Sequence, residues 1–223
     1  SGALALQTQT TTNSGTLAGG NALTLDGQAL NNSGLLSAKT LTLNSTDITN
    51  SGTLQGTGSL AATSNTLNNQ QGGVLLGNGA VTLKNDQLNN AGQIQGGSLD
   101  VTTGEWHNSG TALGQNGLNA TVNGTLDNQG NVVSQQAMTL TAGNSDNRGT
   151  LMANVLALYG DLRNSGLIQG TDGLNWTGST LTGTADGQLV SRRSLALQGS
   201  APDNQGPTQR RTPRRTAPGP PTQ

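Results

Sequence analysis

A short motif recurs along this chain at an almost constant spacing, and no other feature restricts the possible folds as strongly. A glycine, usually two positions after an asparagine, returns at intervals of 17 to 21 residues with a mean of about 19. The glycines are Gly15, Gly34, Gly52, Gly73, Gly92, Gly110, Gly130, Gly149, Gly166, Gly187 and Gly206. Gly73 and Gly187 follow irregular segments. So short a period, sustained over nearly the whole chain, predicts a solenoid in which each repeat forms one coil.

Aliphatic residues occupy fixed places relative to each glycine. Two positions after it come Leu17, Leu36, Leu54, Leu75, Ile94, Ala112 as a weak copy, Val132, Leu151, Ile168 and Leu189. An apolar-x-apolar pair follows as Leu23/Leu25, Leu41/Leu43, Val81/Leu83, Leu99/Val101, Met138/Leu140, Leu156/Leu158, Leu174/Trp176 and Leu195/Leu197. A single apolar residue precedes the asparagine as Leu30, Ile48, Leu67, Leu88, Trp106, Leu126 and Leu162. This alternation with period two predicts strands, and no run has the i, i+3, i+4 spacing of a helix.

Each repeat therefore predicts two or three short strands joined by turns at glycine and asparagine, residues that tolerate positive φ. A coil of about 19 residues buries its apolar face only when it is stacked on others. The prediction is an all-β, right-handed parallel β-helix over residues 1–206, with about ten coils and a length of roughly 48 Å. A leucine-rich repeat has a longer period with helical segments, and a calcium-binding β-roll needs Gly-Gly-x-Gly-x-Asp runs, which are missing from the sequence.

The composition alone permits either disorder or a repeat fold with small aliphatic cores. Charged residues make up 9% of the chain, and it has no Phe, one Tyr and two Trp. The absence of Cys excludes disulfides and thiolate metal sites. No apolar stretch is long enough for a transmembrane helix. Because the chain begins at Ser1 without a signal-like segment, we interpret it as an internal part of a longer protein.

Charge is distributed unevenly between the repeats and the C-terminal residues. Residues 1–190 carry four basic and ten acidic groups, a net charge of −6, whereas residues 191–223 carry six Arg and one Asp, a net charge of +5. The body therefore has no nucleic-acid-binding character. Residues 207–223 contain five of the six Pro, and Pro cannot donate to a β-ladder. We expect no further coil after residue 206 and a disordered Pro/Arg-rich tail.

The recurring asparagines form the main candidate site. They are Asn13, Asn32, Asn50, Asn90, Asn108, Asn128, Asn147 and Asn164. The structural interpretation, which we favour, is a ladder in which equivalent side chains hydrogen-bond from coil to coil. The alternative is a face that binds carbohydrate.

A catalytic or metal site has little support in the residue spacing. His107 is the single histidine, and it is expected to point outward with Glu105 on either side of an inward Trp106. A metal needs about three or four ligands. A Ser-His-Asp triad needs a carboxylate and an activated serine beside the histidine, and the residue spacing offers no such set. A β-helical glycosidase would need two neighbouring carboxylates, but the Asp residues are expected at different repeat positions. The expectation is that the chain holds no cofactor and is not an enzyme.

The unit N-x-G-x-L, then L-x-L, then L-x-N-x-G resembles the haemagglutinin repeat of filamentous haemagglutinins, which also builds the stalks of contact-dependent inhibition exoproteins. The likeness covers about residues 4–206. It implies a fibrous β-helix exported by two-partner secretion through a dedicated outer-membrane transporter. The weak copies near Ala112, Ser145 and Ala185 mark places where the coils are expected to bulge.

Together these observations predict a structural or adhesive stalk segment of a secreted or cell-surface exoprotein. Its role would be in adhesion or in toxin presentation. Apart from the transporter, the expected partner is a glycan or receptor on a host or neighbouring cell. Two alternatives stay open at this point: a β-helical carbohydrate-active enzyme, and a passive spacer.

Overall fold

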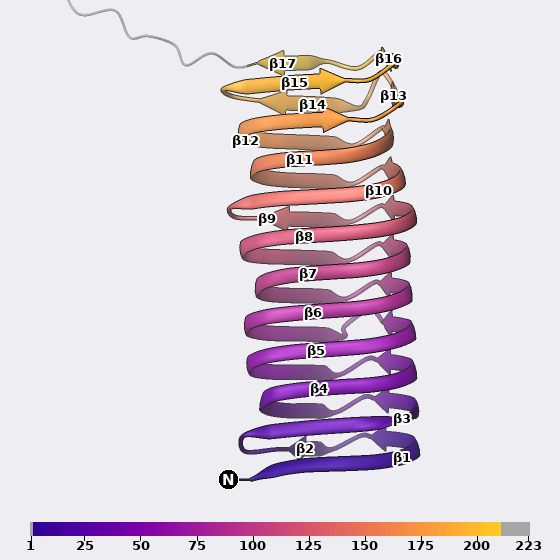
Figure 1. Ribbon diagram of the computed structural model, residues 1–223, viewed down its shortest axis with the longest axis vertical. Helices are drawn as coiled ribbons and strands as arrows, with labels where there is room; N and C mark the ends of the chain where they lie inside the picture. Colours follow the sequence, from indigo (N-terminus) through magenta and orange to yellow (C-terminus); the bar gives the residue numbers. More distant parts are fainter. Residues whose placement is uncertain (1, 211–223) are drawn as a thin grey trace, which may run out of the picture.

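The computed structural model describes residues 2–210, which form a single column of stacked coils (Figure 1). The strands are β1 Ala3–Asn13, β2 Thr16–Ala18, β3 Ala22–Asn32, β4 Leu35–Asn50, β5 Thr53–Asn69, β6 Val74–Asn90, β7 Gln93–Asn108, β8 Thr111–Asn128, β9 Asn131–Ser134, β10 Ala137–Asn147, β11 Thr150–Asn164, β12 Leu167–Thr177, β13 Thr180–Gly183, β14 Gln188–Ser191, β15 Ser194–Gln198, β16 Ala201–Asn204 and β17 Thr208–Arg210. No helix occurs in residues 2–210, so none of the described segments could cross a membrane as a helix.

Every strand pairing is parallel, and each coil pairs with the coil before it and the coil after it. Leu23, for example, lies in register with Leu4 below and Leu41 above. The near side of the column runs from left to right as the chain climbs, which makes the coil right-handed (Figure 1). The prediction of a parallel β-helix with a coil of about 19 residues is therefore confirmed.

The core is a set of continuous apolar columns along the axis. The aliphatic side chains of the predicted pattern are almost completely buried from Leu23 in the second coil to Leu189 near the C-terminal end. Each fully buried Leu contributes roughly 1.5–3 kcal/mol relative to an exposed one. Trp106 takes a leucine position between Leu88 and Leu126 and is 0% exposed, as the sequence predicted.

The recurring glycines are required for a different reason from the one the sequence suggested. None of them has positive φ, and the positive-φ residues among the described ones are Gly72 and Gly160. A Cβ at Gly110 would instead overlap the carbonyl oxygen of Gly92 in the coil below. The turns stack so closely that a side chain has no room, so the expectation of left-handed turns is wrong and close backbone approach replaces it.

Differences in coil length are absorbed locally, without losing the register. The 21-residue interval between Asn69 and Asn90 contains an enlarged turn with Gly72 at φ 84°. A register shift between Ala142 and Asn144 adjoins Ser145, as expected for a weak copy. Ala112 itself stays in register between Ile94 and Val132, and a register shift follows shortly after it, where Gly114 and Gly117 pair with Gly96 and Ser98.

The C-terminal end continues slightly beyond the predicted boundary at residue 206. β17 lies after that boundary, and Thr208 is in register with Leu189 of β14. The rest of the proposed tail, residues 211–223, lies outside the described part of the chain, so its disorder stays a prediction.

Candidate functional site

The predicted asparagines lie one above another along a single edge of the column. The Nδ2 of each donates to the Oδ1 of the next over distances of 2.7–2.9 Å, from Asn13 through to Asn164. Asn69 also belongs to this row, between Asn50 and Asn90. The sequence prediction omitted Asn69 because three residues instead of one separate it from its glycine, although its place two residues after Leu67 identifies it.

Backbone carbonyls use the remaining donor capacity of these amides. Asn108 Nδ2 also lies 3.3 Å from the carbonyl oxygens of Gly110 in its own turn and Asn131 in the next coil. The side chain of Asn108 is 1% exposed. A buried amide whose donors and acceptors are engaged by the fold is stabilising. It has little hydrogen-bonding capacity left for a ligand.

The row of asparagines is interrupted near the C-terminal end. Gly183 takes the equivalent position between Asn164 and Asn204. A Cβ at Gly183 would overlap the Oδ1 of Asn204, so the amide of Asn204 leans into the space that an asparagine side chain would fill. That oxygen is buried and accepts no hydrogen bond from the described residues.

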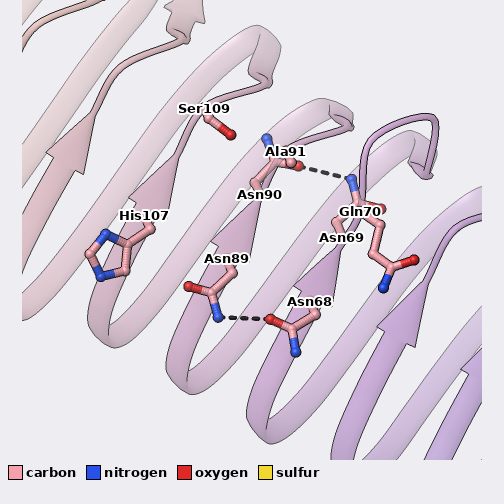
Figure 2. A pocket seen from close by; sticks show the side chains of 8 residues that line it. All are labelled: Asn68, Asn69, Gln70, Asn89, Asn90, Ala91, His107 and Ser109. Carbon is pink, nitrogen blue, oxygen red and sulfur yellow. Dashed lines mark hydrogen bonds between the residues drawn. The ribbon is translucent and has the colours of Figure 1, made fainter.

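Beside the row of asparagines runs a shallow groove of about 260 Å³, which we call the amide groove. Figure 2 shows its lining, which is Asn68, Asn69, Gln70, Asn89, Asn90, Ala91, His107 and Ser109. The buried amides of Asn69 and Asn90, joined at 2.8 Å, form its base. On one wall, Asn89 Nδ2 donates to Asn68 Oδ1 at 2.7 Å.

Charged side chains follow His107 in the next two coils. The Nδ1 of His107 lies 3.4 Å from Asp127 Oδ2 in the next coil, and Arg148 contacts both Asp127 at 3.2 Å and Asp146 at 3.0 Å. Gln129 Nε2 donates to Asp127 at 3.1 Å.

One sequence expectation, that the Asp residues occupy different repeat positions, is wrong at this point. Asp127 and Asp146 share one repeat position and lie in register in adjacent coils, and the next coil brings Asp127 beside His107. Both proximities depend on register across about 20 residues, which spacing along the chain does not display. No serine or threonine hydroxyl bonds the His107 ring within residues 2–210, and no cluster of three potential metal ligands occurs there.

Two further acidic residues bind the backbone of the following coil. Glu105 Oε2 accepts from the N–H of Thr125 at 2.8 Å, beside a register shift. Asp161 Oδ1 accepts from the N–H groups of Thr180 at 2.9 Å and Ser179 at 3.2 Å. The N–H of Thr180 is the main cause that lowers the pKa of Asp161, against an opposing contribution from desolvation. Each carboxylate bonds its coil to the backbone of the next coil, a role that the sequence did not reveal.

A parallel β-helix with a buried asparagine ladder and tightly stacked glycine turns is a fibrous repeat protein, built by adding coils. The sequence profile of the family described as Haemagglutinin repeat matches residues 1–46, 36–105, 94–166 and 168–208. The chain belongs to the haemagglutinin-repeat family.

The most informative relatives are very long proteins that the chain matches only in part. Toxin CdiA of Escherichia coli is 37% identical over 202 residues, which cover 87% of this chain and 6% of that protein. Deoxyribonuclease CdiA of Dickeya dadantii (strain 3937) is 38% identical over 139 residues, 60% of this chain and 4% of that protein. tRNA nuclease CdiA of Escherichia coli O6:K15:H31 (strain 536 / UPEC) is 37% identical over 160 residues, which cover 71% of this chain and 5% of that protein. No solved structure matches the chain.

Proposed function

We propose that this chain is a stalk segment of a large secreted exoprotein and that it performs no catalysis. The observation that carries the proposal is the continuous ladder from Asn13 to Asn164, which joins successive coils into one column. Such a column adds about 4.8 Å of reach for each coil of about 19 residues. The nuclease and toxin names belong to proteins of which this chain matches 4–6%, so those activities are not assigned to it.

The family relationship supports export by two-partner secretion through an outer-membrane transporter, and display at the cell surface. The stalk would hold an active region of the exoprotein away from the producing cell, for adhesion or for toxin presentation. The partner that we propose for adhesion is a glycan or receptor on a host or neighbouring cell.

A deletion that preserves the repeat tests the stalk role. Removing residues 14–204 from the parent exoprotein joins Asn13 to Gln205-Gly206 and so retains the N-x-G turn. We expect the surface filament to shorten by about 48 Å, at about 4.8 Å for each of ten coils, while export continues. Electron cryotomography of producing cells measures the length.

Replacement of the deleted coils separates a stalk from an enzyme or a dedicated receptor-binding segment. Ten other coils of the parent, inserted at the same junction, should restore both filament length and contact-dependent activity if only reach matters. Restored length without restored activity would contradict a purely structural role.

A further inference from the structure

We infer that the amide groove binds the hydroxyl groups of an uncharged sugar. Sugar binding here would account for the adhesive part of the function proposed above. Only the biological purpose of the site rests on that proposed function. The ladder itself cannot do this because its amides are buried and engaged by the fold.

The walls of the groove offer hydrogen-bonding groups that the protein leaves open. The bond between Asn89 and Asn68 uses one donor of Asn89 and the oxygen of Asn68. The Oδ1 of Asn89 and the Nδ2 of Asn68 point away from that bond (Figure 2). The side chains of Gln70 and Ser109 hydrogen-bond to no other residue in the part of the chain that the structure describes. Amide and hydroxyl groups pair with sugar hydroxyls as both donors and acceptors.

These groups come from three successive coils and are held by a rigid base. Adjacent coils place equivalent atoms about 4.8 Å apart along the axis. The stacked amides of Asn69 and Asn90 fix the strands that carry Asn68 and Asn89. Binding groups that are already ordered lose little conformational entropy when a ligand arrives. The exposed methyl of Ala91 provides a small apolar surface between Gln70 and Ser109 for the C–H face of a ring.

The charge distribution favours a neutral ligand. His107 is the one ionisable side chain in the lining. The carboxylate of Asp127 beside it is engaged by Arg148, so neither a strong anion site nor a strong cation site remains. A second groove differs because its lining includes two oppositely charged side chains, Lys84 and Asp86.

The size of the groove limits the ligand and its affinity. About 260 Å³ is slightly below the ~300–1,000 Å³ of typical small-molecule pockets. One sugar ring would fill it, and the shallow contact predicts dissociation constants of about 1 mM or weaker. Many copies displayed on one cell would raise the effective affinity by multivalency.

The test titrates the 223-residue chain with lactose, maltotriose and methyl β-N-acetylglucosaminide, and follows the Asn and Gln side-chain amide signals by NMR. We expect saturable shifts of the Asn68, Gln70 and Asn89 amides with at least one probe. Asn89→Ala should weaken that binding by about tenfold, the effect of losing one or two hydrogen bonds. Asn44→Ala is the matched control because Asn44 makes a similar exposed cross-coil bond of 2.8 Å, to Asp26, far from the groove; it should leave binding unchanged.

Three outcomes would overturn the inference. They are the absence of amide shifts with all three probes at their highest soluble concentrations, equal binding by Asn89→Ala and the unmodified chain, and stronger binding of 3′-sialyllactose than of lactose. The coil-replacement experiment is independent of this titration. A chain that binds no sugar but whose coils are replaceable refutes the groove and leaves the stalk role intact.

Discussion

The side-chain Nδ2 of Asn90 donates a 2.8 Å hydrogen bond to the Oδ1 of Asn108, although 18 residues separate the two in sequence. Both side chains are buried, at 2% and 1% exposure. The same bond recurs between the other adjacent asparagines from Asn13 to Asn164. In a protein with so few charged and aromatic residues, this row specifies the vertical alignment that apolar columns alone would leave free to slip.

Replacing Asn108 by Ala should destabilise the column. The change leaves the Oδ1 of Asn128 without its ladder donor and the Nδ2 of Asn90 without its ladder acceptor. The carbonyl of Gly110 keeps its bond from the backbone N–H of Asn131. Unsatisfied buried polar groups cost about 1–3 kcal/mol, and each kcal/mol lowers Tm by about 2–4 °C in a chain of this size. Thermal unfolding followed by circular dichroism measures the shift. An unchanged melting curve would show that the ladder does not stabilise the fold.

The same substitution at Asn164 should cost less than at Asn108. Asn164 accepts from Asn147, but its amide donates only to the carbonyl of Gln188, because Gly183 occupies the next ladder position. Fewer groups are therefore left unpaired by Asn164→Ala. Parallel melts of the two variants give the order, and a larger loss at Asn164 would contradict the account of the ladder.

Gly110→Ala should be strongly destabilising because the new Cβ overlaps the carbonyl oxygen of Gly92. Overpacking of this kind costs about 1–3 kcal/mol, or more when backbone must move. Gly117→Ala is the control, since its Cβ would approach only the carbonyl of Ala137, at 3.8 Å. We expect the stability of that variant to change by less than about 1 kcal/mol. Urea denaturation compares them, and equal midpoints would refute the close-approach explanation.

Asp161→Asn should alter the acid dependence of stability. Because the folded protein lowers the pKa of Asp161, the ionised group stabilises the fold above its unfolded pKa of about 3.9. That contribution disappears as the pH falls through the folded pKa. The unmodified chain should therefore be more stable than Asp161→Asn at pH 7, and the difference should shrink on acidification.

Asp47 provides the control for that pH effect. It stands three residues before its ladder asparagine, as Asp161 does, but its carboxylate accepts no hydrogen bond from the described residues. Melting curves for Asp47→Asn should follow those of the unmodified chain both at pH 7 and after acidification. A pH-independent difference for Asp161→Asn would instead point to a steric effect of the substitution.

The sequence predicted the columns but not all of the contacts between them. Leu23, Leu41 and their equivalents recur with a fixed period, so stacking follows directly from spacing. Asn69 was missed because an inserted turn displaced its glycine. The contact between His107 and Asp127 was missed because bulges, which depend on backbone packing, set the register between their coils.

The glycines show a different limit of sequence reasoning. Glycine recurs at the same place in each repeat, but the sequence does not show whether the backbone there needs positive φ or needs space beside it. The stacking of Gly110 on Gly92 identifies space as the reason. The hydrogen bonds of Glu105 and Asp161 to the next coil could likewise not be predicted, because neither residue recurs at its position in every repeat.

The most direct test of the central claim measures distances along one column of the outer face. Thr24 starts this column. Asn119, Thr139 and Asn175 lie in register with it, five, six and eight coils above. The chain has no native Cys, so spin labels can be attached to cysteines introduced in pairs with Thr24→Cys. Pulsed electron paramagnetic resonance should give narrow distributions near about 24, 29 and 38 Å, a slope of about 4.8 Å per coil. Broad distributions, or distances that do not increase linearly with the number of coils, would contradict the stacked-coil column.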